Sequence, residues 1–124
     1  MVLVDTSVWI SHFRDGDDHL SLLLNEGEVL CHTFIIGELA CGNLKNRVQI
    51  LSLLNSLPKS VFVNHKEILF FIEKIGLMGK GLGYIDMSLL ASSLITESPI
   101  WTLDKRLQII SSQFKLNYSP NRRT

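Results

Sequence analysis

Hydrophobic residues along the chain follow two patterns, short uninterrupted runs and longer stretches in which they recur every three or four positions. The short runs are typical of buried strands, whereas the longer spacing predicts amphipathic helices. We expect strands at residues 1–4, 28–32, 60–63, 99–103 and 115–118. We expect helices at residues 7–13, 19–27, 33–44, 47–57, 66–78, 84–95 and 105–114. Strands that alternate with helices favour a parallel sheet covered by helices on both faces, which is an α/β fold.

Polar and small residues predict where several of these elements begin and end. Asp17 or Asp18 is expected to cap the second helix, which Gly27 ends. Thr33 is expected to cap the third helix. The stretch GKGLG at 79–83 predicts a flexible loop, since its glycines lack the spacing of a phosphate-binding loop.

The composition limits the class of protein. Hydrophobic residues make up 46% of the 124 residues and the mean hydropathy is +0.23, which excludes a disordered chain. We expect a single domain spanning residues 1–124, because neither a repeat nor a linker divides the sequence. Twelve basic and twelve acidic residues cancel, so a polyanion would have to be bound by local contacts.

The sequence also predicts a compartment. Asp5 interrupts the first apolar run, and no stretch reaches the roughly 18 apolar residues of a membrane span. Cys31 and Cys41 are too few for a disulfide framework and lie in or beside apolar stretches. We interpret both as reduced core residues and expect a cytoplasmic protein.

Four acidic residues lie where a parallel sheet brings chain segments together. Asp5 and Asp104 follow the first and fourth expected strands, whose carboxyl ends are natural neighbours where the strand order reverses. Asp86 stands in the first turn of the helix that leads to the fourth strand, and Glu38 stands in the helix after the second strand. These positions allow the four side chains to converge.

Helix capping is the alternative for the three aspartates. A carboxylate near a helix start is stabilising by about 0.3–1 kcal/mol through the helix dipole, which suffices to explain them. Capping does not explain Glu38, which lies within a helix beside a buried stripe. For Glu38 the alternatives are a place on the polar edge of the helix, or an ion pair with a base such as Lys45 or Arg47.

Four sequence blocks resemble the signature blocks of the PIN-domain ribonucleases, and of the VapC-type toxins of toxin–antitoxin pairs in particular. The blocks read VLVDTSVWI at 2–10, GEL at 37–39, YIDMSLLASS at 84–93 and IWTLD at 100–104. They stand in the family's order, and the match spans nearly the whole chain. Each block alone is weak evidence, whereas four in register are strong evidence.

The resemblance implies a three-layer α/β/α fold with a central parallel sheet of about five strands. It implies an endoribonuclease that hydrolyses RNA phosphodiesters through a metal-activated water. The positions that match the family's acidic quartet, as metal ligands and catalytic residues, are Asp5, Glu38, Asp86 and Asp104. The implied ion is Mg²⁺ or Mn²⁺, which oxygen ligands suit.

The electrostatics of four carboxylates agree with this expectation. Two carboxylates about 5 Å apart repel each other by roughly 3 kcal/mol at an effective dielectric constant of about 20. A quartet therefore does not stay fully ionised without a cation, and the site should require metal.

The resemblance also implies supporting residues and partners. Ser7 and Thr102 match hydroxyl positions that support the pocket. Many members carry a further acid or Asn two residues after the last Asp, and because this position is Arg106 here, we expect no fifth ligand. Lys80 and Arg106 are the expected RNA contacts beside the site. The implied partners are RNA, a VapB-type antitoxin and a second copy of the chain.

The remaining basic, aromatic and histidine residues are interpreted as surface or core. Further phosphate contacts are possible, although solvated surface is the more common role, at Lys45, Arg47, Lys105, Arg122 and Arg123. Trp9 and Trp101 are expected in the core and not as stacking platforms. The four histidines are expected at the surface or at an edge, and not as zinc ligands.

Three alternative functions are consistent with parts of the sequence. A PIN nuclease of RNA processing without an antitoxin would share the pocket, and a catalytically inert PIN interaction module would share the fold. A receiver-type signalling domain is also an α/β protein with an acidic pocket. It expects paired acids after the first strand, where VDTSV offers one.

Overall fold

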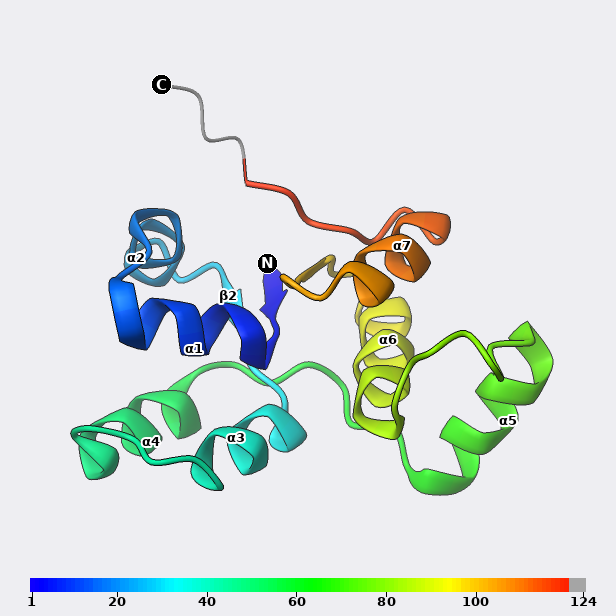
Figure 1. Cartoon of the computed structure of the whole chain (residues 1–124), viewed down its shortest axis with the longest axis horizontal. Coiled ribbons are helices and arrows are strands. Elements are labelled where there is room, and N and C mark those ends of the chain that lie inside the picture. Colours follow the sequence, from blue (N-terminus) through cyan, green and yellow to red (C-terminus); the bar gives the residue numbers. More distant parts are fainter. Residues whose placement is uncertain (121–124) are drawn as a thin grey trace.

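The computed structural model describes residues 1–120, in which helices and short strands alternate along the chain (Figure 1). The strands are β1 (Val2–Val4), β2 (Val29–Leu30) and β3 (Ile100–Trp101). The helices are α1 (Thr6–Asp15), α2 (Asp18–Asn25), α3 (Thr33–Ala40), α4 (Arg47–Ser56), α5 (His65–Ile75), α6 (Tyr84–Thr96) and α7 (Lys105–Gln113). All the expected helices are therefore present, with ends shifted by a few residues at most.

The central strand β1 pairs on both sides in a parallel sheet of order β2-β1-β3. Leu3 of β1 lies opposite Leu30 on one side and Ile100 on the other. All strand residues are buried, as expected of a parallel sheet with helices on both faces. Because β1 and β3 are neighbours, the residues that follow them, Asp5 and Asp104, come to the same edge of the sheet.

The two outer strands predicted at 60–63 and 115–118 are wrong as full strands. Each outer segment pairs with the sheet at a single parallel bridge. The bridges join Cys31 to Lys59 and Ile100 to Asn117. The sheet of the described residues therefore has three strands where about five were expected, with an extended segment along each edge.

The reasons for these short pairings are local. At the first edge, the N–H of Val61 donates to Thr96 Oγ1 at 3.1 Å, and the Val61 carbonyl accepts a hydrogen bond from the Ser92 hydroxyl. Hydroxyls of α6 thus hold the segment that would otherwise continue as a strand. At the second edge, Ile100 alone bonds to the outer segment through its N–H and its carbonyl, because β3 is only 2 residues long.

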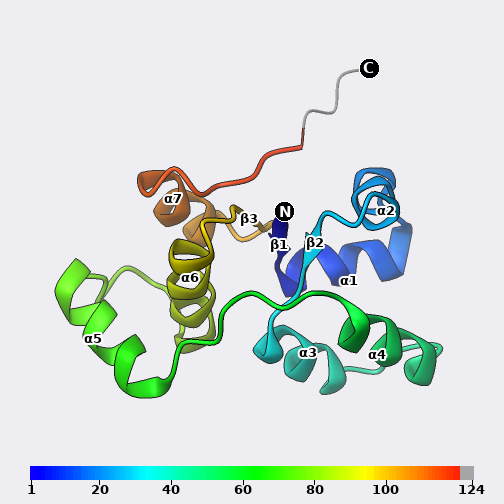
Figure 2. The same ribbon diagram turned by 180° about the vertical axis from the view of Figure 1, so that it is seen from behind.

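Helices cover both faces of the sheet. In two opposite views, α1 to α4 lie on one side of the sheet and α5 to α7 lie on the other (Figure 1 and Figure 2). Within these layers α3 packs against α1 and α4, and α6 packs against α5 and β3. The three-layer α/β/α arrangement is therefore confirmed.

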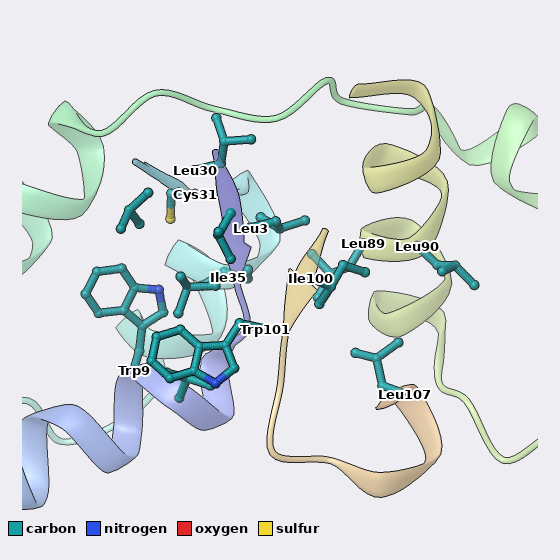
Figure 3. Close-up of a cluster of buried hydrophobic side chains, with 14 of the residues drawn as sticks. Leu3, Trp9, Leu30, Cys31, Ile35, Leu89, Leu90, Ile100, Trp101 and Leu107 are labelled. Atoms are coloured by element: carbon teal, nitrogen blue, oxygen red, sulfur yellow. The ribbon is translucent and has the colours of Figure 1, made fainter. Parts of the chain in front are cut away.

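Apolar side chains fill the space between the sheet and each helical layer. Figure 3 shows Trp9 and Ile35 beside β1 on one side, and Leu89 and Leu107 beyond β3 on the other. All four have 0% of their surface exposed, and burying each stabilises the fold by about 1.5–3 kcal/mol. Trp101 is also buried, so both tryptophans belong to the core as predicted.

Two expectations about individual residues are wrong. Cys31 is buried, but Cys41 is exposed on the surface after α3, so only Cys31 is a core residue although both thiols are free. His32 is buried and does not lie at the surface.

Within residues 1–120, no helix combines the length and the apolar character that crossing a membrane requires.

Side-chain caps begin α2 and α3. Asp17 caps α2 as predicted, since its Oδ1 accepts a hydrogen bond from the N–H of Leu20 at 2.9 Å. The predicted Thr33 cap is wrong, because the extended backbone of β2 continues to His32 and Thr33 is already helical. His32 Nδ1 accepts a hydrogen bond from the N–H of Phe34 at 2.9 Å, which requires an unprotonated ring nitrogen.

The stability of the protein should therefore decrease in mild acid. Burial lowers the pKa of His32 below its ordinary value of 6.5. Because the unfolded chain binds this proton more readily, the free energy of unfolding is greatest above pH 6.5 and falls as the pH decreases through 6.5 toward the folded pKa. The variant His32→Asn keeps a capping acceptor that does not titrate, so it should flatten this decline. Urea unfolding on both sides of that pH measures the effect, and equal slopes in the two proteins would contradict it.

Candidate active site

Asp5 ends the central strand and is nearly buried, with 7% of its surface exposed. Its backbone stands at the start of α1, but its side chain makes no capping bond to that helix. Its Oδ2 accepts hydrogen bonds from Thr102 Oγ1 at 2.7 Å and from Ser7 Oγ at 2.9 Å. The capping interpretation of Asp5 is therefore wrong, because two hydroxyls hold this carboxylate and not the helix backbone.

The same two hydroxyls hold the turn that leads from β3 to α7. Ser7 Oγ accepts a hydrogen bond from the N–H of Leu103 at 3.0 Å, and Thr102 Oγ1 accepts one from the N–H of Asp104 at 3.1 Å. The two hydroxyl oxygens are 3.3 Å apart. The structure thus places both predicted supporting residues beside Asp5, in a network that also fixes the backbone of Asp104.

Asp104 and Asp86 do bind helix starts. Asp104 Oδ1 accepts hydrogen bonds from the N–H groups of Arg106 at 2.8 Å and Leu107 at 3.2 Å, at the start of α7. Asp86 Oδ2 accepts a hydrogen bond from the N–H of Gly83 at 3.2 Å, directly before α6. The capping interpretation is confirmed for these two residues, and each uses only one carboxylate oxygen for it.

Glu38 projects from the exposed side of α3. Its Oε1 accepts a hydrogen bond from Thr6 Oγ1 at 2.8 Å, which links α3 to the first residue of α1. The ion pairs found within residues 1–120 involve neither Glu38 nor Lys45 nor Arg47. Arg47 donates to two backbone carbonyls at the end of α3. The ion-pair alternative for Glu38 is therefore wrong, and its place on the polar edge of the helix is confirmed.

Thr6 is a neighbour of the site that was not expected. Its hydroxyl reaches a residue 32 positions further along the chain, and no local pattern reveals a contact of that kind. A partial signal was present in the run DTS directly after the apolar strand. Three polar side chains at the carboxyl end of a central strand all face the edge where parallel sheets form their sites.

The charges of three carboxylates of the acidic quartet act on the fourth, Asp86. Burial is the main cause that raises the pKa of Asp86 above its ordinary value of 3.8, and the bond from Gly83 opposes it. The charges of the other three carboxylates raise this pKa further, in the order Asp5, Asp104 and Glu38. The carboxylates that follow β1, stand in α3 and precede α7 are therefore all close enough to Asp86 in α6 to raise its pKa. In Figure 1 the start of α1, α3 and the start of α6 lie near one another at the same end of the sheet.

Each carboxylate of the quartet leaves one oxygen without a hydrogen bond inside the described part of the chain. The free atoms are Asp5 Oδ1, Glu38 Oε2, Asp86 Oδ1 and Asp104 Oδ2. Asp5 Oδ1 is absent from the fully buried polar atoms that lack a partner in residues 1–120, so it keeps contact with solvent. Four hard oxygen donors of this kind suit a divalent cation.

The present side-chain orientations do not yet enclose an ion. Within residues 1–120, no three His, Cys, Asp or Glu side chains are grouped closely enough to hold one. Like charges repel, and each carboxylate is held by its own separate donors. Side-chain rotation would be needed to bring the free oxygens onto a common cation.

The predicted RNA contacts Lys80 and Arg106 belong to segments beside the quartet. Lys80 is exposed in the loop at 79–83. Arg106 lies against Gly81 of the same loop, since a Cβ added to Gly81 would be 2.9 Å from Arg106 Cδ. Whether either residue binds RNA stays a prediction. Of the other basic candidates, Lys45, Arg47 and Lys105 are exposed, whereas Arg122 and Arg123 lie outside the described residues.

Comparisons with known proteins find similarity over most of the chain. The PIN domain family model matches residues 2–112, a range that includes the whole acidic quartet. Ribonuclease VapC32 from two strains of Mycobacterium tuberculosis is 45% identical to this chain over 109 residues. That match covers 87% of this chain and 88% of the relative.

Replacing Asp5 with Asn should lower the pKa of Asp86, because it removes the largest of the charges that raise it. Asn can still accept the bonds from Ser7 and Thr102, so the fold should be retained and Tm should hold or rise. An NMR titration of the Asp86 carboxyl measures the shift. The control Asp18→Asn, at the exposed start of α2, should leave the titration unchanged. An Asp86 pKa that does not respond to Asp5→Asn would contradict the convergence of the quartet.

Proposed function

The chain belongs to the PIN-domain family, and on that premise we propose that it is a divalent-metal-dependent endoribonuclease, the VapC-type toxin of a toxin–antitoxin pair. The proposed reaction is the hydrolysis of phosphodiester bonds within RNA. The relationship to a VapC ribonuclease supports this proposal, and the chemistry of the acidic quartet carries it.

The single observation that carries the proposal is how the four carboxylates are held. Neutral hydroxyls and backbone amides fix each of them, and within residues 1–120 no basic side chain forms an ion pair with any of them. Acids that share one electrostatic field and each keep an oxygen free are arranged to bind a cation.

A divalent cation would be held by the free oxygens of the quartet, and we propose Mg²⁺ or Mn²⁺ because both prefer oxygen ligands. When bound, such an ion supplies Lewis-acid polarisation of the phosphodiester and a nucleophilic water at neutral pH. The quartet is proposed to serve as both the ligand set and the catalytic group.

The chain's own hydroxyls keep the ligands in place. Ser7 and Thr102 restrict the Asp5 carboxylate to one orientation, and Thr6 restricts Glu38. A site whose polar groups are already oriented spends less free energy on reorganisation during the reaction. Thr6 therefore joins the supporting residues that the family resemblance implies.

A VapB-type antitoxin is the proposed protein partner. A groove of about 580 Å³ lies between α1, α3 and α4, and Glu38 is among its lining residues. Ile10, Phe13 and Ile50 give this groove an apolar wall, and Ile10 is 50% exposed. An amphipathic helix laid in the groove would cover Glu38, and an Arg on that helix would meet the quartet.

A homodimer is the proposed oligomeric state. Large apolar side chains remain exposed on several helices of the described part, among them Leu22, Val48, Ile95 and Ile109. A second copy of the chain would cover part of these exposed apolar side chains. Light scattering of the purified protein distinguishes a dimer from a monomer.

Cleavage of RNA should require Mg²⁺ or Mn²⁺ and should stop in EDTA. The products should carry 5′-phosphate and 3′-hydroxyl ends, because water and not the substrate 2′-hydroxyl is the nucleophile. The metal should also raise Tm, with a gain of about 2.7 kcal/mol in the free energy of unfolding at roughly one hundred times Kd. Analysis of RNA ends and thermal melts measure both effects. Cleavage in EDTA, or products with a 2′,3′-cyclic phosphate, would contradict the mechanism.

The matched variant for this experiment is Glu38→Gln, which keeps the shape of the side chain and can still accept the bond from Thr6. Its single-turnover hydrolysis should be at least ~100-fold slower, equivalent to about 2.7 kcal/mol of transition-state stabilisation. Its Tm should hold or rise. Glu73→Gln, on the exposed side of α5, should cleave at the unaltered rate. Near-normal hydrolysis by folded Glu38→Gln protein would remove Glu38 from the site.

Co-expression with the product of the gene immediately upstream should yield a stable complex in which RNA cleavage is suppressed. Ile10→Asp in the groove wall should weaken this complex, because it places a charge on apolar surface that the partner covers. Ile109→Asp, on the exposed face of α7, should not weaken it. Purification that returns only free, active protein would favour a PIN nuclease without an antitoxin.

A further inference from the structure

Aromatic rings from separate segments meet beside the acidic quartet. The ring centroids of Phe34 in α3 and Phe62, which precedes α5, are 5.5 Å apart and the rings meet edge to face. The ring of Tyr84, the first residue of α6, lies 6.3 Å from that of Phe34. The Tyr84 hydroxyl is 2.8 Å from Nδ1 of His65 in α5, which fixes the position of the tyrosine ring. We call Phe34, Phe62 and Tyr84 the ring cluster.

The ring cluster lies outside the hydrophobic core, although its two phenyl rings contact the buried His32, with ring centroids at 5.3 Å and 6.0 Å. Its three residues are neither in the hydrophobic core of the described residues nor among the half-buried side chains packed against that core. Phe62 is 53% exposed and Tyr84 is 39% exposed, whereas the core residue Trp9 is 0% exposed. Rings that contact one another and stay exposed form the kind of apolar patch that marks a binding surface.

The ring cluster borders the acidic quartet through two helices. Phe34 and Glu38 are one turn apart on α3, so their side chains lie on the same face of that helix. Tyr84 begins α6, two residues before Asp86, and its ring is placed beside this site by its contact with Phe34. A polynucleotide with one phosphodiester at Glu38 would therefore carry an adjacent nucleotide past the ring of Phe34.

The charges of the chain favour a contact of this kind. The net charge is +0, and the quartet repels phosphate groups. Bases of single-stranded RNA stack on aromatic side chains, an attraction that needs no opposite charge. Bases within duplex RNA are already stacked on each other and cannot reach such rings.

We propose that the ring cluster is a stacking subsite for an unpaired RNA base next to the scissile phosphodiester. This inference rests on the proposed endoribonuclease function, and it adds a contact that positions the base beside the bond that is cut. Phe62 is the most exposed phenyl ring of the cluster and receives the base, while Phe34 and Tyr84 support it. Every base has a stacking face, so the subsite selects an unpaired strand and not a particular sequence.

The variant Phe62→Leu tests the subsite, because it removes the ring and keeps an apolar side chain at an exposed position. The probe is a short single-stranded RNA with 2-aminopurine at successive positions, in Ca²⁺ in place of Mg²⁺, because Ca²⁺ offsets the charge of the quartet and as a weaker Lewis acid leaves the probe intact. Binding to the unaltered chain should quench the fluorescence at one position, since stacking quenches 2-aminopurine. Phe62→Leu should abolish this quenching and weaken binding on the order of 10-fold.

An abasic nucleotide at the quenched position provides a second arm. It should weaken binding to the unaltered chain by the same factor, and it should have no further effect on Phe62→Leu, because the ring and the base form one interacting pair. The control Phe70→Leu changes a phenylalanine of α5 that is 65% exposed and outside the ring cluster, and it should bind and quench normally.

Three results would overturn the subsite. They are quenching that survives Phe62→Leu, equal binding of the probe annealed to its complement, and an unaltered chain that does not bind the probe. If Phe62→Leu keeps its quenching and turns a dimer into a monomer, the ring cluster is a contact with a second copy of the chain. Normal hydrolysis by Glu38→Gln overturns the proposed function, whereas slow hydrolysis by Glu38→Gln with intact quenching in Phe62→Leu overturns the stacking subsite alone.

Discussion

The hydroxyl bonds to Asp5 are the interaction on which the rest of the site depends. A carboxylate at the end of a buried central strand is costly unless its oxygens are hydrogen-bonded, and Ser7 and Thr102 supply these bonds at 2.9 Å and 2.7 Å. The parallel pairing of β1 with β3 brings Asp5 and Thr102 together, since the N–H of Asp5 donates to the Trp101 carbonyl at 2.9 Å. Because the two hydroxyls also accept backbone N–H groups from the turn after β3, one network fixes β1, α1 and the start of α7 together.

Neutral donors have a different consequence from basic partners. An Arg or Lys paired with Asp5 or Glu38 would lower the pKa of the acid and occupy its oxygens, so no further cation would be needed. Hydroxyls and backbone amides orient the carboxylates and leave their charge uncompensated. The raised pKa of Asp86 reflects this condition, because burial and three like charges act on it together. The same bonds that stabilise the fold thus maintain an electrostatic repulsion that a divalent cation would relieve.

Helices and strands whose hydrophobic pattern lies within their own residues were predictable from the sequence. Contacts between segments that are far apart in the chain were not. The segment at 60–63 has the composition of a strand, but its pairing ends where the Thr96 hydroxyl takes the N–H of Val61. The start of α1 favoured a cap for Asp5, whereas its carboxylate is held by Ser7 and by Thr102, which is 97 positions away. The acidic positions were predictable because the carboxyl ends of neighbouring parallel strands share one edge. Ser7 and Thr102 were expected only through the family resemblance, and the bond from Thr6 to Glu38 was not expected, because it joins side chains of two helices that are distant in the chain.

A nuclease site of this kind has to satisfy two opposing electrostatic demands. The quartet must be acidic enough to hold a divalent cation, yet the same charges repel the RNA backbone. A chain with a net charge of +0 cannot balance this with a broad positive field, and Arg106, two residues after Asp104, packs on Gly81. Base stacking would suit the binding of RNA at such a site, because it acts on the base and would leave the phosphate to a bound metal. Phe34 and Tyr84 stand on the helices that carry Glu38 and Asp86, so the two proposed kinds of contact would share the same two helices.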